Sequence, residues 1–143
     1  MSKTSIESGD IFKIYTDGAA RGNPGPAAYA FIFVDKDNII HKGSGYIGTA
    51  TNNMAEYQAI INALKAAEKF HKGQLQIYSD SNLAVQQINK KWKVNYPHLL
   101  ELRSKVYQLC EKYEKVEFFH ASRKNTYIQK CDELCNFQLD KDG

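Results

Sequence analysis

The spacing of apolar residues changes sharply near residue 50 of this 143-residue sequence, and this change constrains the fold more than any other feature. Apolar and β-branched runs at residues 11–16, 27–34 and 39–47 are joined by short polar or glycine-rich segments, which predicts three antiparallel strands. From residue 53 to residue 70, apolar side chains recur every three or four positions, as on one face of a helix. Strands followed by helices predict a layered α/β domain.

The second half of the sequence alternates strand-like and helix-like segments. Strands are predicted at residues 75–78 and 116–119, with a polar loop at residues 120–127. Helices are predicted at residues 82–89, about 97–113 and about 129–139. Because the chain is too short for two ordinary hydrophobic cores, we expect a single domain over residues 1–143, of which residues 1–10 form a polar leader.

The amino-acid composition gives only limited information about what the protein binds and where it is located. The net charge of +3, from 19 Lys and Arg against 16 Asp and Glu, is too small to indicate nucleic-acid binding by itself. Cys110, Cys131 and Cys135 contain no C-x-x-C pair and indicate neither a disulfide framework nor a zinc site, so we expect a reducing, cytoplasmic location. No apolar run approaches the roughly 18 residues that span a bilayer, so no membrane partner is expected. No leftover apolar stripe calls for a dimer, and we expect a monomer.

Three acidic residues stand where predicted strands and helices meet. Asp17 follows the first strand, Glu56 lies in the first turn of the long helix, and Asp80 follows the fourth strand. If the first and fourth strands are parallel neighbours, these carboxylates gather at one rim of the sheet, where open α/β sheets bind ligands. Crowded carboxylates repel unless a cation neutralises them, and Mg²⁺ prefers such oxygen ligands. The acids therefore predict metal-assisted phosphoryl chemistry.

Each acid also has an ordinary structural explanation. Asp17 precedes Gly18 and could simply belong to a turn. Glu56 could complete a capping box that begins at Asn53, and Asp80 could cap the helix that follows it. Spacing alone leaves the metal site and these local roles as open alternatives.

Four motifs together resemble the type 1 ribonuclease H family. They are DGAARGNPGPAAYAF, TNNMAEYQAIINAL, YSDSNLAVQQI and CDELCN, and their order and approximate spacing match the family from about Phe12 to Leu139. The resemblance implies a five-stranded mixed sheet, with three antiparallel strands followed by two parallel ones, flanked by helices. It also implies endonucleolytic cleavage of the RNA strand of an RNA·DNA hybrid, leaving a 3′-hydroxyl and a 5′-phosphate.

The resemblance also implies a metal site. Asp17, Glu56 and Asp80 correspond to acids that bind two Mg²⁺ ions when substrate is present, with Mn²⁺ as a substitute. Asp132 corresponds to a fourth acid, at the start of the final helix. Its neighbour Glu133 is a rival, but adjacent helical residues point about 100° apart, so only one of the two can face the rim.

The histidines differ in what the resemblance implies for them. His120 corresponds to the family's mobile histidine, which is thought to assist product release or proton transfer. Twelve positions separate it from Asp132, which is longer than usual for members with this histidine. For His41, His71 and His98 we expect exposed positions without a function.

Nucleic-acid contacts are implied around the same rim. The loop containing Gly22 and Asn23, together with Asn52 and Asn53, corresponds to residues that contact 2′-hydroxyls and bases, by which RNA is distinguished from DNA. Thr51 corresponds to a residue of a phosphate pocket for the DNA strand. A tight turn and a helix cap are compatible structural roles for these residues. The expected substrate contacts are Gly18, Arg21, Gly22, Asn23, Thr51, Asn52, Asn53, Ser81, Lys90, Lys91, Trp92, Lys93 and Arg123.

The segment KKWKVN is the main basic feature. Lys90, Lys91 and Lys93 surround Trp92, the single tryptophan. The segment is either a short version of the basic protrusion with which some family members grip the hybrid, or a solvated connector with Trp92 packed in the core. Phosphate contacts here and at Arg123 would set affinity and its salt dependence rather than sequence preference.

Two other functions stay open beside a hybrid-cutting nuclease. One is a catalytically silent module that binds hybrid or double-stranded RNA, and the other is a metal nuclease of the same fold that acts on DNA. Four clustered acids argue against the silent module, since negative charge beneath phosphates weakens binding. The asparagine and glycine set for 2′-hydroxyls argues against a DNA substrate. Whether double-stranded RNA is also cut is not determined by the sequence.

Overall fold

The sheet at the centre of the computed structural model has five strands in the order β3-β2-β1-β4-β5. Residues 11–143 are described, so the predicted leader, residues 1–10, lies outside the described residues. The elements are β1 (Ile11–Ala20), β2 (Gly25–Asp35), β3 (Asn38–Ala50), α1 (Asn52–Ala67), β4 (Gln74–Ser79), α2 (Asn82–Ile88), α3 (Pro97–Cys110), β5 (Lys115–His120) and α4 (Thr126–Asp142). Strands β1, β2 and β3 pair antiparallel, whereas β4 and β5 are added parallel to β1. The predicted mixed sheet is confirmed.

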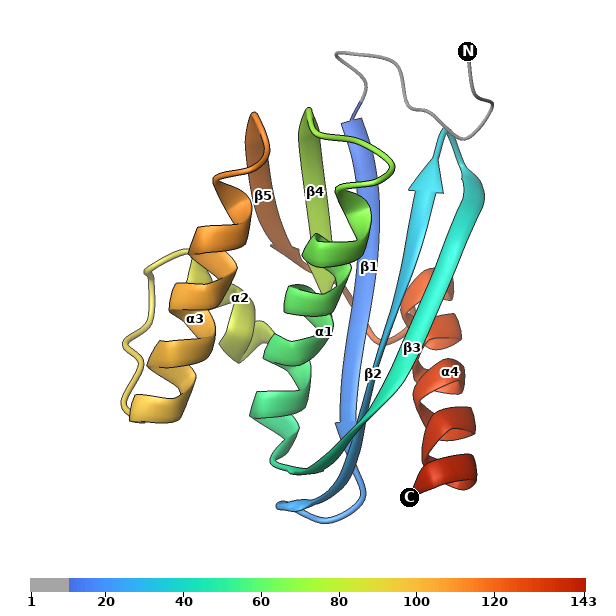
Figure 1. Ribbon diagram of the computed structural model, residues 1–143, viewed down its shortest axis with the longest axis vertical. Coiled ribbons are helices and arrows are strands. Elements are labelled where there is room, and N and C mark those ends of the chain that lie inside the picture. The colour runs from blue at the N-terminus through green and yellow to red at the C-terminus, as the bar shows by residue number, and fades with distance from the viewer. Residues whose placement is uncertain (1–10) are drawn as a thin grey trace.

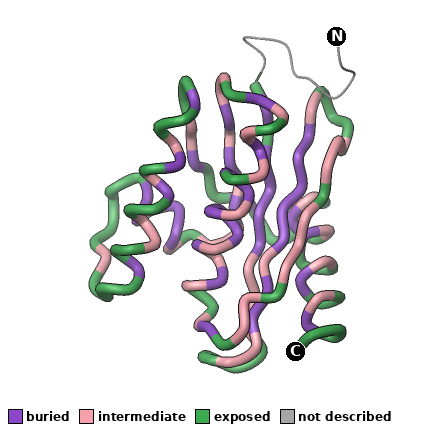
Figure 2. Tube along the Cα trace, viewed as in Figure 1, coloured by how far each residue is buried: buried purple, intermediate pink, exposed green. Residues whose placement is uncertain are grey.

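Helices cover the two faces of the sheet unequally. Helices α1, α2 and α3 lie on one side, and α4 alone lies on the other (Figure 1). Alternation along β1 explains the two layers, because Phe12 and Ile14 enter the larger core while Tyr15 enters the core beneath α4. Buried residues accordingly run along the strands and the inner faces of the helices (Figure 2).

The predicted end of the first strand is wrong. Strand β1 continues past Asp17 to Ala20, and Asp17 itself pairs with Ala30 of β2. The segment Gly18–Ala20 has low strand propensity and reads as a loop, but its backbone pairs with residues 27–29 of β2. Asp17 is therefore held within a paired strand, opposite Ala30, rather than placed in a turn.

Two predicted helix starts are also wrong. Helix α1 is capped by Thr51, whose Oγ1 accepts a hydrogen bond of 3.1 Å from the amide of Met54. Asn53 lies inside the helix, so it does not form the expected capping box with Glu56. Helix α4 begins at Thr126 rather than near residue 129, because Asn125 caps it through bonds to two amides of the first turn.

The structure decides between the two alternatives for Trp92 and corrects the expected positions of two histidines. Trp92 is 46% exposed, so the alternative in which it packs into the core is wrong. His71 is only 7% exposed and stacks on Phe12, so its expected surface position is wrong. His98 is exposed as expected, whereas His41 is half-buried, so its expected exposed position is also wrong. Within residues 11–143, no helix is long and apolar enough to cross a bilayer.

Candidate active site

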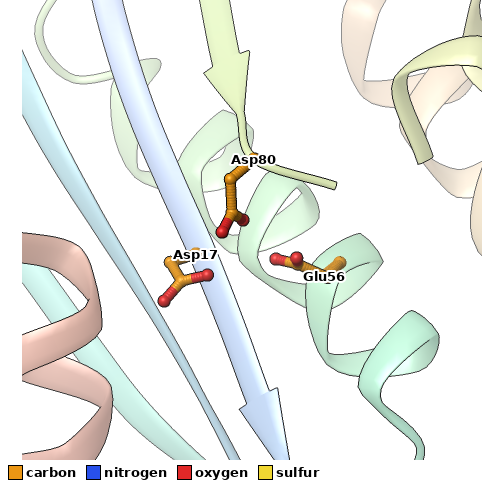
Figure 3. A group of neighbouring side chains, drawn as sticks. All are labelled: Asp17, Glu56 and Asp80. Carbon is orange, nitrogen blue, oxygen red and sulfur yellow. The ribbon is translucent and has the colours of Figure 1, made fainter. Parts of the chain in front are cut away.

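Three carboxylates converge from three separate elements. Asp17 comes from the middle of β1, Asp80 directly follows the last residue of β4, and Glu56 projects from the early part of α1 (Figure 3). One ligand oxygen from each carboxylate lies within 4.8 Å of the others. The parallel pairing of β1 with β4 explains the arrangement, because it ends at the residues directly before Asp17 and Asp80. The structure thus brings together acids that are up to 63 positions apart in the sequence.

Gly18 allows Glu56 to reach the strand. The amide of Gly18 donates a hydrogen bond of 2.7 Å to Glu56 Oε1. A Cβ on Gly18 would lie 2.2 Å from the backbone carbon and oxygen of Ala55, so only glycine lets α1 approach β1 this closely. Gly18, expected to contact substrate, lines the cavity and also positions one of the acids.

The local electrostatics oppose full ionisation of the cluster. Burial, followed by the charges of Asp80 and Asp132, raises the pKa of Asp17 to about 8. Burial and the charges of Asp17 and Asp80 raise the pKa of Glu56 well above its ordinary value, although the Gly18 amide acts in the opposite direction. Asp17 and Glu56 therefore favour their protonated forms near neutral pH unless a cation is present.

One oxygen of the cluster also requires a partner. Asp80 Oδ1 is buried and has no hydrogen-bond partner among residues 11–143. A buried oxygen of this kind is costly unless something binds it. A hard divalent cation would provide the missing partner for Asp80 Oδ1 and would also neutralise the repulsion among the carboxylates, because it binds carboxylate oxygens. The residues therefore fit a divalent metal site.

A fourth acid completes the cavity in front of the cluster. The cavity has a volume of about 550 Å³ and is lined by Asp17, Glu56, Asp80 and Asp132. Asp132 lies in the second turn of α4, whereas its rival Glu133 does not line the cavity. Five of the expected substrate contacts also line it: Gly18, Asn52, Asn53, Ser81 and Arg123.

Arg123, rather than His120, lies against the acids. The Arg123 Nε atom is 3.5 Å from Asp80 Oδ2, and the arginine lines the cavity. His120 is the exposed last residue of β5 and pairs with Ser79, but it does not line the cavity. Arg123 is three positions after His120. The segment that was expected to supply a histidine therefore supplies an arginine to the site instead.

Two asparagines tie the loop after β1 to the start of α1. Asn52 Oδ1 accepts a 3.0 Å hydrogen bond from the Ala20 amide, and Asn23 Oδ1 accepts one of the same length from the Asn52 amide. Because both side-chain carbonyls accept from backbone amides, the Nδ2 groups are the donors left for a ligand. The loop and the helix start are thereby fixed to each other beside the acids.

The basic segment lies on an adjoining surface. A second cavity, of about 370 Å³, is lined by Trp92 and Lys93 and shares Asn53 with the first cavity. Lys90 and Lys91 are exposed farther along, and Lys90 Nζ lies 5.4 Å from the centre of the Tyr107 ring. The cavity beside Trp92 and Lys93 thus adjoins the cavity that contains the acids.

Three residues near the acids were not assigned a role from the sequence. Asn136 Nδ2 donates to Asp132 Oδ2 at 3.4 Å, a contact that their separation of four positions on a helix would have indicated. Cys131 and Cys135 are buried, and their thiols lie 3.4 Å from the carbonyl oxygens of Tyr15 and Asp17, respectively. Burial raises the pKa of both thiols, which marks them as packing groups.

The sequence and the structure resemble those of ribonucleases H. Residues 10–138 match the RNase H family. The chain is 39% identical to ribonuclease HI of Halobacterium salinarum over 127 residues, which are 88% of this chain and 63% of that protein. It is 35% identical to a bifunctional protein of Mycobacterium tuberculosis over 89% of this chain but only 35% of that protein. The chain thus spans less than two thirds of these relatives.

Solved structures resemble the chain over nearly their whole length. RNase H1 from Halobacterium salinarum superposes with a TM-score of 0.86 at 37% identity, covering 92% of this chain and 98% of that one. LC11-RNase H1, solved in complex with an RNA/DNA hybrid, gives a TM-score of 0.83 at 38% identity, covering 91% and 97%. Because the family match covers most of its length and its fold superposes on solved RNase H1 structures, the chain belongs to the RNase H family.

Proposed function

We propose that this protein is a metal-dependent endoribonuclease that hydrolyses the RNA strand of RNA·DNA hybrids and leaves a 3′-hydroxyl and a 5′-phosphate. One observation carries the proposal: the carboxylates of Asp17, Glu56 and Asp80 converge in a cavity where their mutual repulsion and one unpaired buried oxygen call for a cation. The proposed ions are two Mg²⁺, with Mn²⁺ as a substitute. A silent binding module would gain nothing from this cluster, which would repel phosphates.

The four acids would hold the ions, and their proton content would couple metal binding to pH. The pKa of Asp17, about 8, means that this carboxyl releases a proton when a cation binds at neutral pH. Paired divalent ions, when bound, activate water and stabilise the oxygen that leaves a phosphodiester. Arg123 would contact a phosphate at the mouth of the cavity, where it already faces Asp80.

Selection for RNA would come from the paired asparagines. The Nδ2 groups of Asn23 and Asn52 remain available as donors, and a 2′-hydroxyl oxygen is an acceptor that DNA lacks. Glycines around Asn23 permit close approach by the ligand backbone. Beyond Asn53, Lys93 and Trp92 would contact the backbone of the partner strand, with little dependence on sequence.

The remaining parts of the proposal concern the whole protein. We expect the chain to act as one domain, because the two largest hydrophobic clusters lie against the same sheet, and we also expect it to be a monomer. A cytoplasmic location would fit its three free thiols, Cys110, Cys131 and Cys135.

The test is cleavage of labelled duplexes of identical sequence made as RNA·DNA, RNA·RNA and DNA·DNA. We expect the hybrid to be cut in Mg²⁺ and not in EDTA, and Asp17→Asn to lower the rate at least about 100-fold, as loss of a metal ligand should. Asp35→Asn, a matched change at the far end of β2, should leave the rate unchanged.

Other results of the same assay would contradict the proposal or indicate another function. Cleavage that survives EDTA or Asp17→Asn would contradict the metal mechanism. Cutting of DNA·DNA at the same rate would indicate a DNA-directed nuclease. Hybrid binding without turnover, unchanged by EDTA, would indicate a silent module. The RNA·RNA duplex determines whether double-stranded RNA is also a substrate.

A further inference from the structure

Arg21, which directly precedes the substrate loop (residues 22–25), is held by the last turns of α4. Its Nη2 atom is 2.6 Å from Asp140 Oδ1 and 3.4 Å from both the carbonyl oxygen and Oδ1 of Asn136. The Arg21 and Asp140 side chains are 46% and 70% exposed, so a ligand at the loop can reach both. The proposed reaction uses neither Asp140 nor Asn136.

These contacts occupy the nitrogen that a phosphate needs most. A guanidinium binds phosphate most strongly through two parallel N–H bonds, made either by Nε with Nη2 or by Nη1 with Nη2. Nη2 belongs to both pairs, and its contacts are to Asp140 and Asn136. Because Nη2 has only two N–H groups for these three contacts, a phosphate that bridges either pair must compete with Asp140 and Asn136 for this nitrogen.

We propose that Asp140, assisted by Asn136, is an internal substitute for phosphate that holds Arg21 in the free protein and must be displaced when a hybrid binds. This inference rests on the proposed function, since its ligand is the phosphate backbone of the hybrid. An exposed ion pair changes an equilibrium constant by up to about fivefold, so displacement is easy but measurable. Asp140 is thus a specificity-determining residue that lowers affinity for polyanions unless they supply a phosphate at Arg21.

A double-mutant cycle on hybrid affinity tests this competition. Binding of a fluorescent RNA·DNA hybrid is measured by anisotropy in EDTA, where no cleavage occurs, for the wild type, Asp140→Asn, Arg21→Gln and the double variant. We expect Asp140→Asn to tighten binding about two- to fivefold with Arg21 present, and clearly less with Arg21→Gln. Asp142→Asn is the matched control, because Asp142 lies on the same helix but contacts Gln138 instead of Arg21.

The outcomes separate this inference from the proposed function. Equal tightening by Asp140→Asn and Asp142→Asn, or equal tightening with and without Arg21, would assign the effect to bulk charge and overturn the inference. Weaker binding by Asp140→Asn would mean that Asp140 orients Arg21 for the ligand, which also overturns it. A wild type that neither binds the hybrid in EDTA nor cuts it in Mg²⁺ would contradict the proposed function itself. Thermal unfolding of each variant checks that these exposed substitutions leave the protein folded.

Discussion

Asp17→Asn should stabilise the metal-free protein while it abolishes the proposed activity. In the folded protein the pKa of Asp17 is about 8, raised by burial and then by the charges of Asp80 and Asp132, against 3.8 for an ordinary aspartate. Between those two values the unfolded chain has lost a proton that the folded chain keeps, so the free energy of unfolding falls as pH rises. Asparagine has no proton to lose and escapes this penalty.

The magnitude follows from the size of that pH window. Each pH unit above 3.8 costs the wild type about 1.4 kcal/mol until the pH reaches the folded pKa. At pH 7 the accumulated penalty is about 4 kcal/mol, and below pH 4 it vanishes. We therefore expect Asp17→Asn to be more stable than wild type by about 4 kcal/mol at pH 7 and of similar stability at pH 3.5. The advantage should shrink when Mg²⁺ is added, because a bound cation relieves the same repulsion.

Urea unfolding in EDTA at several pH values between 3.5 and 8 measures this difference. Asp35→Asn removes an aspartate outside the cluster and should show no comparable pH-dependent gain. The reasoning is refuted if Asp17→Asn is no more stable than wild type at pH 7, or if its advantage is the same at every pH. Either result would mean that the three carboxylates do not strain the folded protein.

Two further substitutions examine how the site is built. Gly18→Ala places a Cβ 2.2 Å from the Ala55 backbone, so α1 must move away from β1. We expect the free energy of unfolding, measured in urea, to fall by about 2 kcal/mol, and hybrid cleavage to fall sharply because Glu56 is displaced. If Gly18→Ala is as stable as the wild type, the close approach of α1 to β1 is not required. Arg123→Gln should hardly change stability, because the Arg123 side chain is 89% exposed. It should weaken hybrid binding and lower the slope of log affinity against log salt concentration by about one, the value expected for one lost phosphate contact. An unchanged salt dependence would exclude Arg123 from phosphate binding.

The topology was predictable because apolar periodicity and the positions of the acids agree. Runs of alternating or continuous apolar residues predicted all five strands, and the pairing of β1 with β4 then required Asp17 and Asp80 to lie together. The end of β1 was not predictable in this way. Gly18, Ala19 and Ala20 have little strand propensity of their own, and only pairing with β2 extends the strand through them.

Details of the site depended on tertiary contacts that local patterns do not encode. Thr51, Asn52 and Asn53 are all good helix caps, and the sequence does not distinguish among them. In the structure, Asn52 bonds to the Ala20 amide, which leaves Thr51 as the cap. The exposure of Trp92 was not predictable for the same reason, because it depends on how the segment between α2 and α3 packs against the rest of the protein.

The proposed metal site is divided between two layers that pack separately, and this has a consequence for its dynamics. Asp17, Glu56 and Asp80 come from the sheet and α1, whereas Asp132 is carried by α4, whose inner face includes Cys131 and Cys135. Local detachment of α4 would withdraw one acid, leave the other three assembled and expose both sulfurs to solvent. The rate at which a thiol reagent labels those cysteines in the native state would therefore measure how often the cluster loses its fourth member.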